Sequence, residues 1–174
     1  GAFVKKYAII GILLLFVVLL AFMTGGNFLQ IENLLNVIRQ VSAIGVIAVG
    51  MTFVIIPKGI DLSVGSILAM SAVVSASLVQ MPGASNTLFP GLQLPWIVGV
   101  LAGLAVGALL GLINGALIAG FKIAPFIATL GMMTAARGLA LIYTVGRPLS
   151  KSNPAYNFIG PGDLLGIPVP IIIL

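Results

Sequence analysis

The chain has 174 residues and a mass of 17.9 kDa; 60% of its residues are hydrophobic, only 6% are charged, and its mean hydropathy is +1.28. Soluble globular chains carry about a quarter charged residues, so eight Lys and Arg with three Asp and Glu are too few to solvate a globule. The composition therefore excludes an ordinary soluble domain and indicates a protein whose solvent is the lipid bilayer.

Five apolar segments predict an all-α fold, a polytopic transmembrane helix bundle. In chain order the expected spans cover 7–23, 41–56, 62–80, 96–120 and 125–145. A cleaved signal peptide is the alternative for the first segment, but residues 21–24 fit a cleavage site poorly. The segment 27–40 has an amphipathic, interfacial pattern, and we expect the second span to continue from it and to begin within its amphipathic part. The residues after Pro168 read as the start of a sixth span that this chain does not complete.

The connections between these spans are polar or rich in proline. Pro57 ends the second span because proline lacks the N–H that a helix needs, and the segment 57–66 is a break in the bundle. The connection 81–95 carries no charge, and 147–168 is a polar, proline-rich loop. Positive charge favours the cytoplasmic side, so we expect the amino terminus inside. This orientation places Lys5, Lys6, Lys58 and Lys122 inside, and Arg147 and Lys151 outside.

The composition also limits the chemistry. The chain has no Cys and no His, which excludes disulfides, thiolate or imidazole metal sites and the common nucleophile and base pairs. The motif GxxxxGK[ST] is absent, so a partner must supply any energy from ATP. The basic residues are scattered rather than clustered, so the net charge of +5 does not indicate a nucleic-acid partner. We therefore expect no catalytic residue, no metal and no cofactor.

A row of glycines lies in the expected fourth span. Glycines at this spacing let another backbone approach closely. Four residues turn a helix by roughly 400°, so each glycine is displaced by about 40° from the one before it. We therefore expect helix packing against two neighbours in succession, within a bundle, rather than one dimer seam. The five glycines, each four residues after the last, are Gly99, Gly103, Gly107, Gly111 and Gly115.

The break at 57–66 allows two interpretations. Asp61, Ser63 and Ser66 lie where the third span begins. In the first interpretation, Asp61 or Ser63 caps the exposed N–H groups of that helix and complements its dipole. In the second, the polar and glycine-rich segment borders a translocation pathway, because such backbone is tolerated at membrane depth only where protein buries it or water reaches it.

Arg137 is the charged residue expected deepest in a span. It lies twelve residues after Pro125, which at ~1.5 Å per residue is about 18 Å into the fifth span. Such a charge is costly and seldom faces lipid. By the same rise, Asn114 lies about 12 Å from the same side, so we expect the two side chains to meet. An internal structural clamp is the favoured interpretation, and a substrate-facing donor is the alternative.

Two blocks of sequence carry distinctive motifs. The first is AVGMTFVII at 48–56 followed by GIDLSVGS at 59–66. The second is GLING at 111–115, KIAPFIATLG at 122–131 and RGLA at 137–140. In this order the blocks resemble the permease subunits of bacterial ABC importers for ribose, xylose, galactose and related sugars. The resemblance covers essentially the whole chain. One departure is Lys58, which follows Pro57 where the family usually has small residues and which we expect to pair with Asp61.

The resemblance implies a multi-pass permease of the bacterial inner membrane that is not itself an enzyme. It implies a neutral monosaccharide as substrate, a cytoplasmic ATP-binding subunit, a periplasmic or lipoprotein sugar-binding protein, and a second permease copy or homologue. It also implies about ten spans, so 1–174 is expected to be a single transmembrane permease domain, the amino-terminal half of a longer chain. Carried over by motif, the pathway residues are Asp61, Ser63, Ser66, Asn114, Thr129 and Arg137.

Two other functions fit part of the sequence. A permease for branched-chain amino acids keeps the architecture and changes the substrate, but the motif at 59–66 argues against it. A membrane scaffold that transports nothing needs only the row of glycines, and leaves Asp61 and Arg137 without a purpose. An apolar conduit with few polar groups also fits a neutral solute better than an ion, which needs rings of charge or ordered carbonyls.

Overall fold

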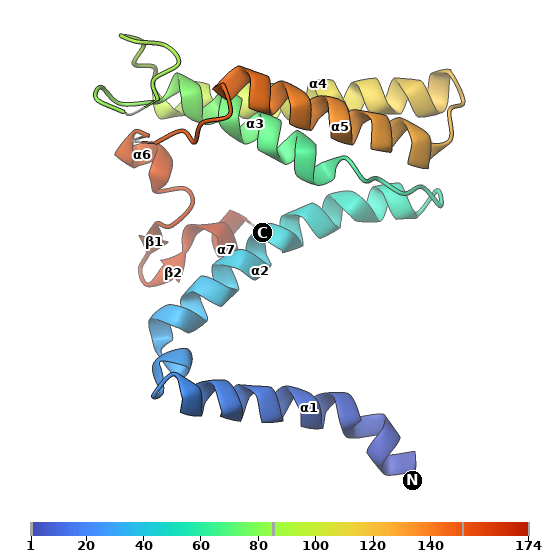
Figure 1. Ribbon diagram of the computed structural model, residues 1–174, viewed down its shortest axis with the longest axis vertical. Coiled ribbons are helices and arrows are strands. Elements are labelled where there is room, and N and C mark those ends of the chain that lie inside the picture. Colours follow the sequence, from blue (N-terminus) through green and yellow to red (C-terminus); the bar gives the residue numbers. More distant parts are fainter. Residues whose placement is uncertain (1, 85, 151, 174) are drawn as a thin grey trace.

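The computed structural model describes residues 2–84, 86–150 and 152–173. Helices form nearly all of the described regular structure, and Figure 1 shows the helices labelled α3, α4 and α5 packed along one another with α1 and α2 to one side. The elements are α1 (Ala2–Met23), η1 (Asn27–Leu29), α2 (Ile31–Ile55), α3 (Val64–Leu78), α4 (Trp96–Gly115), the π-helical turn η2 (Ala116–Gly120), α5 (Pro125–Thr144), α6 (Pro154–Asn157), β1 (Asp163–Leu164), β2 (Ile167–Pro168) and α7 (Val169–Ile173).

The packed core lies among α3, α4 and α5. Leu110 of α4 is buried against Met132 and Ala136 of α5, and partly buried side chains of α3 complete the cluster. In contrast, α1 contacts η1 and lies apart from these three helices (Figure 1). Nearly all its described side chains are exposed, although they are apolar. An apolar surface of this kind needs lipid or another protein as its solvent.

Three described helices are long and apolar enough to cross a membrane. These are Ile31–Ile55 and Trp96–Gly120, with 25 residues each, and Pro125–Thr144, with 20 residues. The part of α1 whose side chains are described, Tyr7–Met23, and the helix α3, Val64–Leu78, are apolar but shorter. The expected count of five complete spans is therefore not reproduced on length, although apolar helices occur in all five expected places.

The first half of α2 is continuous with the second span, which was expected to begin within the amphipathic segment. The short turn η1 precedes α2, which then runs without a break from Ile31 through Ile55. The polar face of α2 contacts the strand β1 through one side chain. Arg39 forms an ion pair with Asp163 at 2.7 Å and also donates to Oδ1 of Asn36 at 2.7 Å. The polar stripe thus includes an intramolecular contact between α2 and β1.

Glycines of α4 set how closely α3 approaches it. A Cβ on Gly99 would lie 2.6 Å from Cγ1 of Val79, and one on Gly103 would lie 3.0 Å from Cβ of Ser75. The next glycine in the row also faces α3. By contrast, a Cβ on Gly111 or Gly115 would meet no described atom within 4 Å. The row of glycines thus winds away from α3 along the helix, as expected. The expected second neighbouring helix is not observed, because no described helix packs against Gly111 or Gly115.

The loop at 147–168 is more ordered than predicted. Asn153 caps α6 by accepting a hydrogen bond from the backbone N–H of Ala155 at 2.9 Å, and Pro154 occupies the first helical turn. The strands β1 and β2 pair antiparallel, and the turn between them contains Leu165 with φ 54°. Apart from this hairpin and a single β-bridge between Gln80 and Ser152, the regular structure of the described residues is helical.

The same loop is attached to the end of α3. The backbone N–H of Asn153 donates to the carbonyl of Val79 at 2.9 Å, and Gln80 pairs with Ser152. The side chain of Gln80, which is buried, also donates to the carbonyl of Asn86 at 2.8 Å. These bonds fix α6 beside the end of α3.

Candidate functional site

The break between α2 and α3 is a compact turn that only glycine can close. After Pro57, Lys58 adopts φ 61°, and the backbone N–H of Gly59 donates to the carbonyl of Val54 at 3.0 Å. A Cβ on Gly59 would lie 2.9 Å from that carbonyl oxygen. A larger residue there would push the two backbones apart, so the path of the chain into α3 depends on this glycine.

Asp61 forms two hydrogen bonds with Ser63, the residue that precedes α3. Its Oδ1 accepts from the backbone N–H of Ser63 at 2.7 Å and from the Ser63 hydroxyl at 2.6 Å. Ser63 is fully buried and occupies the N-cap position, but its side chain accepts no N–H of the helix. Capping in the predicted form is therefore wrong. The predicted pair with Lys58 is also not observed: among the described side chains, the ion pair joins Arg39 and Asp163.

Asn114 and Thr129 join this turn from two other helices. The side-chain amide of Asn114, on α4, donates to Oγ of Ser63 at 2.8 Å. Thr129 Oγ1, on α5, lies 3.2 Å from the carbonyl of Ile60 and 2.8 Å from that of Pro125. Asn114 and Thr129 are both buried. Four of the six predicted pathway residues thus meet where the break contacts α4 and α5.

The other two predicted residues lie outside this network. Ser66 is buried on the first turn of α3, and its side chain takes no part in the hydrogen bonds around Asp61 and Ser63. Arg137 is exposed on α5 and has no hydrogen bond or ion pair within the part of the chain that the structure describes. The expected clamp between Arg137 and Asn114 is wrong, because the amide of Asn114 donates to Ser63 instead.

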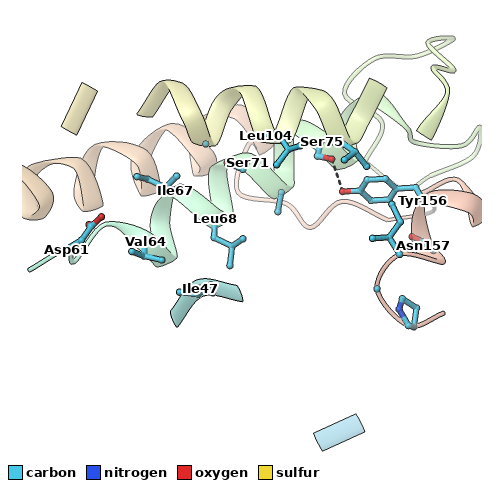
Figure 2. Close-up of a pocket in the computed structure, with 17 residues that line it drawn as sticks. Ile47, Asp61, Val64, Ile67, Leu68, Ser71, Ser75, Leu104, Tyr156 and Asn157 are labelled. Carbon is cyan, nitrogen blue, oxygen red and sulfur yellow. Dashed lines mark hydrogen bonds between the residues drawn. The ribbon is translucent and has the colours of Figure 1, made fainter. Parts of the chain in front are cut away.

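A groove of about 730 Å³ runs along α3 and α4 from the break to α6; we call it the α3–α4 groove. Figure 2 shows Asp61 and Val64 at one end, Tyr156 and Asn157 at the other, and Ile47 of α2 on a further wall. Most of the lining is apolar. Its polar side chains are Asp61, Ser71, Ser75, Tyr156 and Asn157.

Hydroxyl groups are the main polar feature of this groove. Ser75 Oγ lies 2.8 Å from the Tyr156 hydroxyl, within hydrogen-bonding distance (Figure 2). Ser71 Oγ is buried without a hydrogen-bond partner among the described residues. No Lys or Arg lines the groove as described, and Asp61 is its only carboxylate. Such a surface suits a neutral, hydroxylated solute better than an ion.

A second, smaller cavity lies on the other side of Asp61. It has a volume of about 330 Å³, and we call it the Asn114 pocket. Its walls come from the end of α2, the break, the end of α4 with η2, and the start of α5. Asp61 lines both cavities, and Gly111, Gly115 and Thr129 line this one. Within the described residues, no cluster of three or more acidic side chains could hold a metal ion.

The sequence predictions missed the hydroxyl residues of the groove. Ser71 and Ser75 are spaced by four on α3, so they share one face of the helix, and they face Gly103 and Gly107. That spacing of hydroxyls in an apolar helix was a usable signal. Tyr156 carried no such signal, because its position depends on backbone bonds between the 147–162 loop and the end of α3.

Comparison with known proteins identifies relatives along most of the chain. The family model described as branched-chain amino acid transport system, permease component, matches residues 33–161. The ribose import permease protein RbsC of Haemophilus influenzae is 41% identical over 167 residues, which cover 94% of this chain and 48% of the relative. RbsC of Bacillus subtilis is 47% identical over 148 residues, covering 84% of this chain and 42% of the relative.

A third relative is the L-arabinose ABC transporter permease protein AraH of Azospirillum brasilense. It is 37% identical over 163 residues, which cover 92% of this chain and 45% of the relative. The chain therefore spans about half the length of the curated relatives it matches. No solved structure matches the chain.

Proposed function

This chain belongs to the permease family described as the permease component of the branched-chain amino acid transport system, and from that premise we propose that it forms part of the membrane-spanning subunit of an ABC importer for a neutral monosaccharide. The substrate is a pentose or a hexose, and it moves inward. The names of the relatives, which are permeases for ribose and L-arabinose, support sugar as the substrate class.

The observation that carries this proposal is the charge of the α3–α4 groove. A branched-chain amino acid presents an ammonium and a carboxylate, and each would need a partner of opposite charge if it left water. The described lining offers the carboxylate of Asp61 but no Lys or Arg for the substrate's own carboxylate. A sugar needs only hydrogen-bonding groups and apolar contact. Ser71, Ser75 and Tyr156 supply the hydrogen-bonding groups, and the apolar walls of the groove supply the contact.

We extend the pathway along this groove to the break between α2 and α3. Asp61 and the residues bonded around it, Ser63, Asn114 and Thr129, form one end, with Ser66 one turn into α3. Arg137 has a different role in the proposal. A guanidinium in the middle of an apolar helix seldom faces lipid, so we place its partner on another part of the transporter.

The partners follow from the class of transporter. Energy comes from a separate cytoplasmic ATP-binding subunit, since the chain has no phosphate-cradling motif. A periplasmic or lipoprotein sugar-binding protein delivers the substrate, and a second permease copy or homologue completes the membrane part. The exposed apolar side chains of α1 and α2 support burial in the bacterial cytoplasmic membrane or against that second copy.

The test is the rate of ATP hydrolysis by the assembled transporter, reconstituted in lipid with its ATP-binding subunit and binding protein. D-ribose, L-arabinose, D-xylose and D-galactose are added one at a time, with leucine as the matched amino-acid arm. We expect at least one sugar to stimulate hydrolysis and leucine to have no effect. Stimulation by leucine, with no response to any sugar, would replace the proposal with the amino-acid permease that the family description names.

A further inference from the structure

Asp61 lines two cavities, the α3–α4 groove and the smaller Asn114 pocket. The proposed pathway uses the groove and gives the Asn114 pocket no role. The smaller Asn114 pocket has room because the row of glycines on α4 continues past the contact with α3. An added Cβ on Gly111 or Gly115 would meet no described atom within 4 Å, and both residues line the pocket. The described chain therefore keeps this space open and places Asp61 at its boundary.

The orientation of the Asn114 amide follows from its neighbours. A serine hydroxyl has one proton to donate, and Ser63 donates it to Oδ1 of Asp61 at 2.6 Å. Oγ of Ser63 can then only accept, so the group 2.8 Å away must be the NH₂ of Asn114. This assignment leaves Oδ1 of Asn114 as an acceptor. Asn114 is 5% exposed, and its Oδ1 has no partner in the part of the chain that the structure describes.

Asp61 provides a second acceptor beside the pocket. Both of its hydrogen bonds use Oδ1, and Oδ2 makes none with the described residues. The rest of the lining is mainly apolar, including Val54, Ile118 and Pro125. A buried acceptor without a donor is unusual in native proteins and calls for an explanation. Two acceptors in an apolar cavity are suited to a neutral molecule that brings its own donors, as the hydroxyl groups of a sugar do.

We propose that the Asn114 pocket is a second sugar subsite, reached from the α3–α4 groove past Asp61, in which Oδ1 of Asn114 and Oδ2 of Asp61 accept hydrogen bonds from sugar hydroxyls. This inference rests on the proposed function. It makes transport through this chain a movement between two subsites, with Asp61 bordering both. The hydrogen bonds from Ser63 hold Asp61 in place during that movement.

The chain has no cysteine, so single cysteines can report on each cavity. Gly115→Cys probes the Asn114 pocket and Leu104→Cys probes the groove, which Leu104 lines with 66% of its surface exposed. Gly131→Cys is the matched control: it lies on α5, outside both linings, and its added Cβ also meets nothing within 4 Å. Ala119→Cys, which lines the same pocket, replaces Gly115→Cys if that variant does not assemble.

The experiment measures maleimide labelling of each variant in the assembled transporter, in lipid and during ATP turnover, with and without D-ribose, L-arabinose or D-galactose. Labelling is read by mass spectrometry on the peptide that contains the new cysteine. Because only the unoccupied fraction reacts, a sugar at about ten times its dissociation constant should slow labelling about tenfold. We expect this protection at positions 115 and 104, and no protection at 131.

The other outcomes separate the two proposals. Protection at 104 without protection at 115 overturns the second subsite and leaves the sugar permease intact. No protection at either position by any sugar removes the proposed function, and this inference with it. If neither the cysteine at 115 nor the one at 119 is labelled in the absence of sugar, the pocket is closed to solutes, or holds only water, and the second subsite is refuted.

Discussion

The close packing of α4 on α3 predicts a specific loss of stability for Gly99→Ala. The added Cβ would lie 2.6 Å from Cγ1 of Val79 and 3.0 Å from the carbonyl oxygen of Ser75. Val79 is only 1% exposed, so it has little room to move away. Overpacking of this kind costs about 1–3 kcal/mol in the free energy of unfolding. The measured loss of stability is smaller than this cost, because Ala favours a helix over Gly by about 1 kcal/mol and offsets part of it.

Gly111→Ala, on the same helix, is the control that separates the overpacking cost from the helical preference of Ala. It gains the same helical preference, and its Cβ would meet nothing within 4 Å. The difference between the two variants therefore isolates the contact with α3. For a chain of this size, about 1–3 kcal/mol corresponds to a difference in melting temperature of about 2–12 °C. Thermal unfolding of the detergent-solubilised protein measures it. Equal melting temperatures for the two variants would refute close packing of α4 on α3.

Three further predictions follow from side-chain contacts. Tyr156→Phe removes a hydroxyl that lines the groove and that is available to bond a sugar. Loss of one such sugar hydrogen bond, at about 1 kcal/mol, should raise the KM for sugar uptake about fivefold; an unchanged KM would exclude Tyr156 from the pathway. Arg39→Gln and Asp163→Asn should show a coupling energy below about 1 kcal/mol in a double-mutant cycle on thermal stability, because the pair is partly exposed; a coupling of several kcal/mol would contradict this. Arg137→Leu should leave the melting temperature of the chain unchanged, since Arg137 has no partner among the described residues, and a marked decrease would show an internal contact.

The ends of several helices were predictable because local chemistry determines them. Pro125 starts α5, Trp96 starts α4 directly after a proline, and Pro57 follows the end of α2. The glycine row likewise indicated a close helix contact, and its winding agrees with the loss of that contact after Gly107. Each of these features depends on residues within one or two turns of each other, so the pattern in the sequence contains the information.

The features that were wrong or missed depend on distant parts of the chain. The ion pair between Arg39 and Asp163 was missed, because the periodicity of α2 shows that one face is polar but not which distant residue pairs with it. In the same way, depth along two helices predicted that Asn114 would meet Arg137, but the rotation of α5 about its axis leaves Arg137 exposed. The position of Tyr156 depends on tertiary hydrogen bonds. Ser71 and Ser75 are the exception, since their spacing alone could have identified them.

The central claim is that a neutral sugar passes along the α3–α4 groove. Leu104→Trp tests it directly, because Leu104 lines the groove with most of its side chain exposed and a tryptophan there would fill part of it. Uptake of radiolabelled pentose or hexose into proteoliposomes that contain the assembled transporter should require ATP and be lost in this variant, while basal ATP hydrolysis remains. Undiminished uptake by the assembled Leu104→Trp transporter would contradict the account.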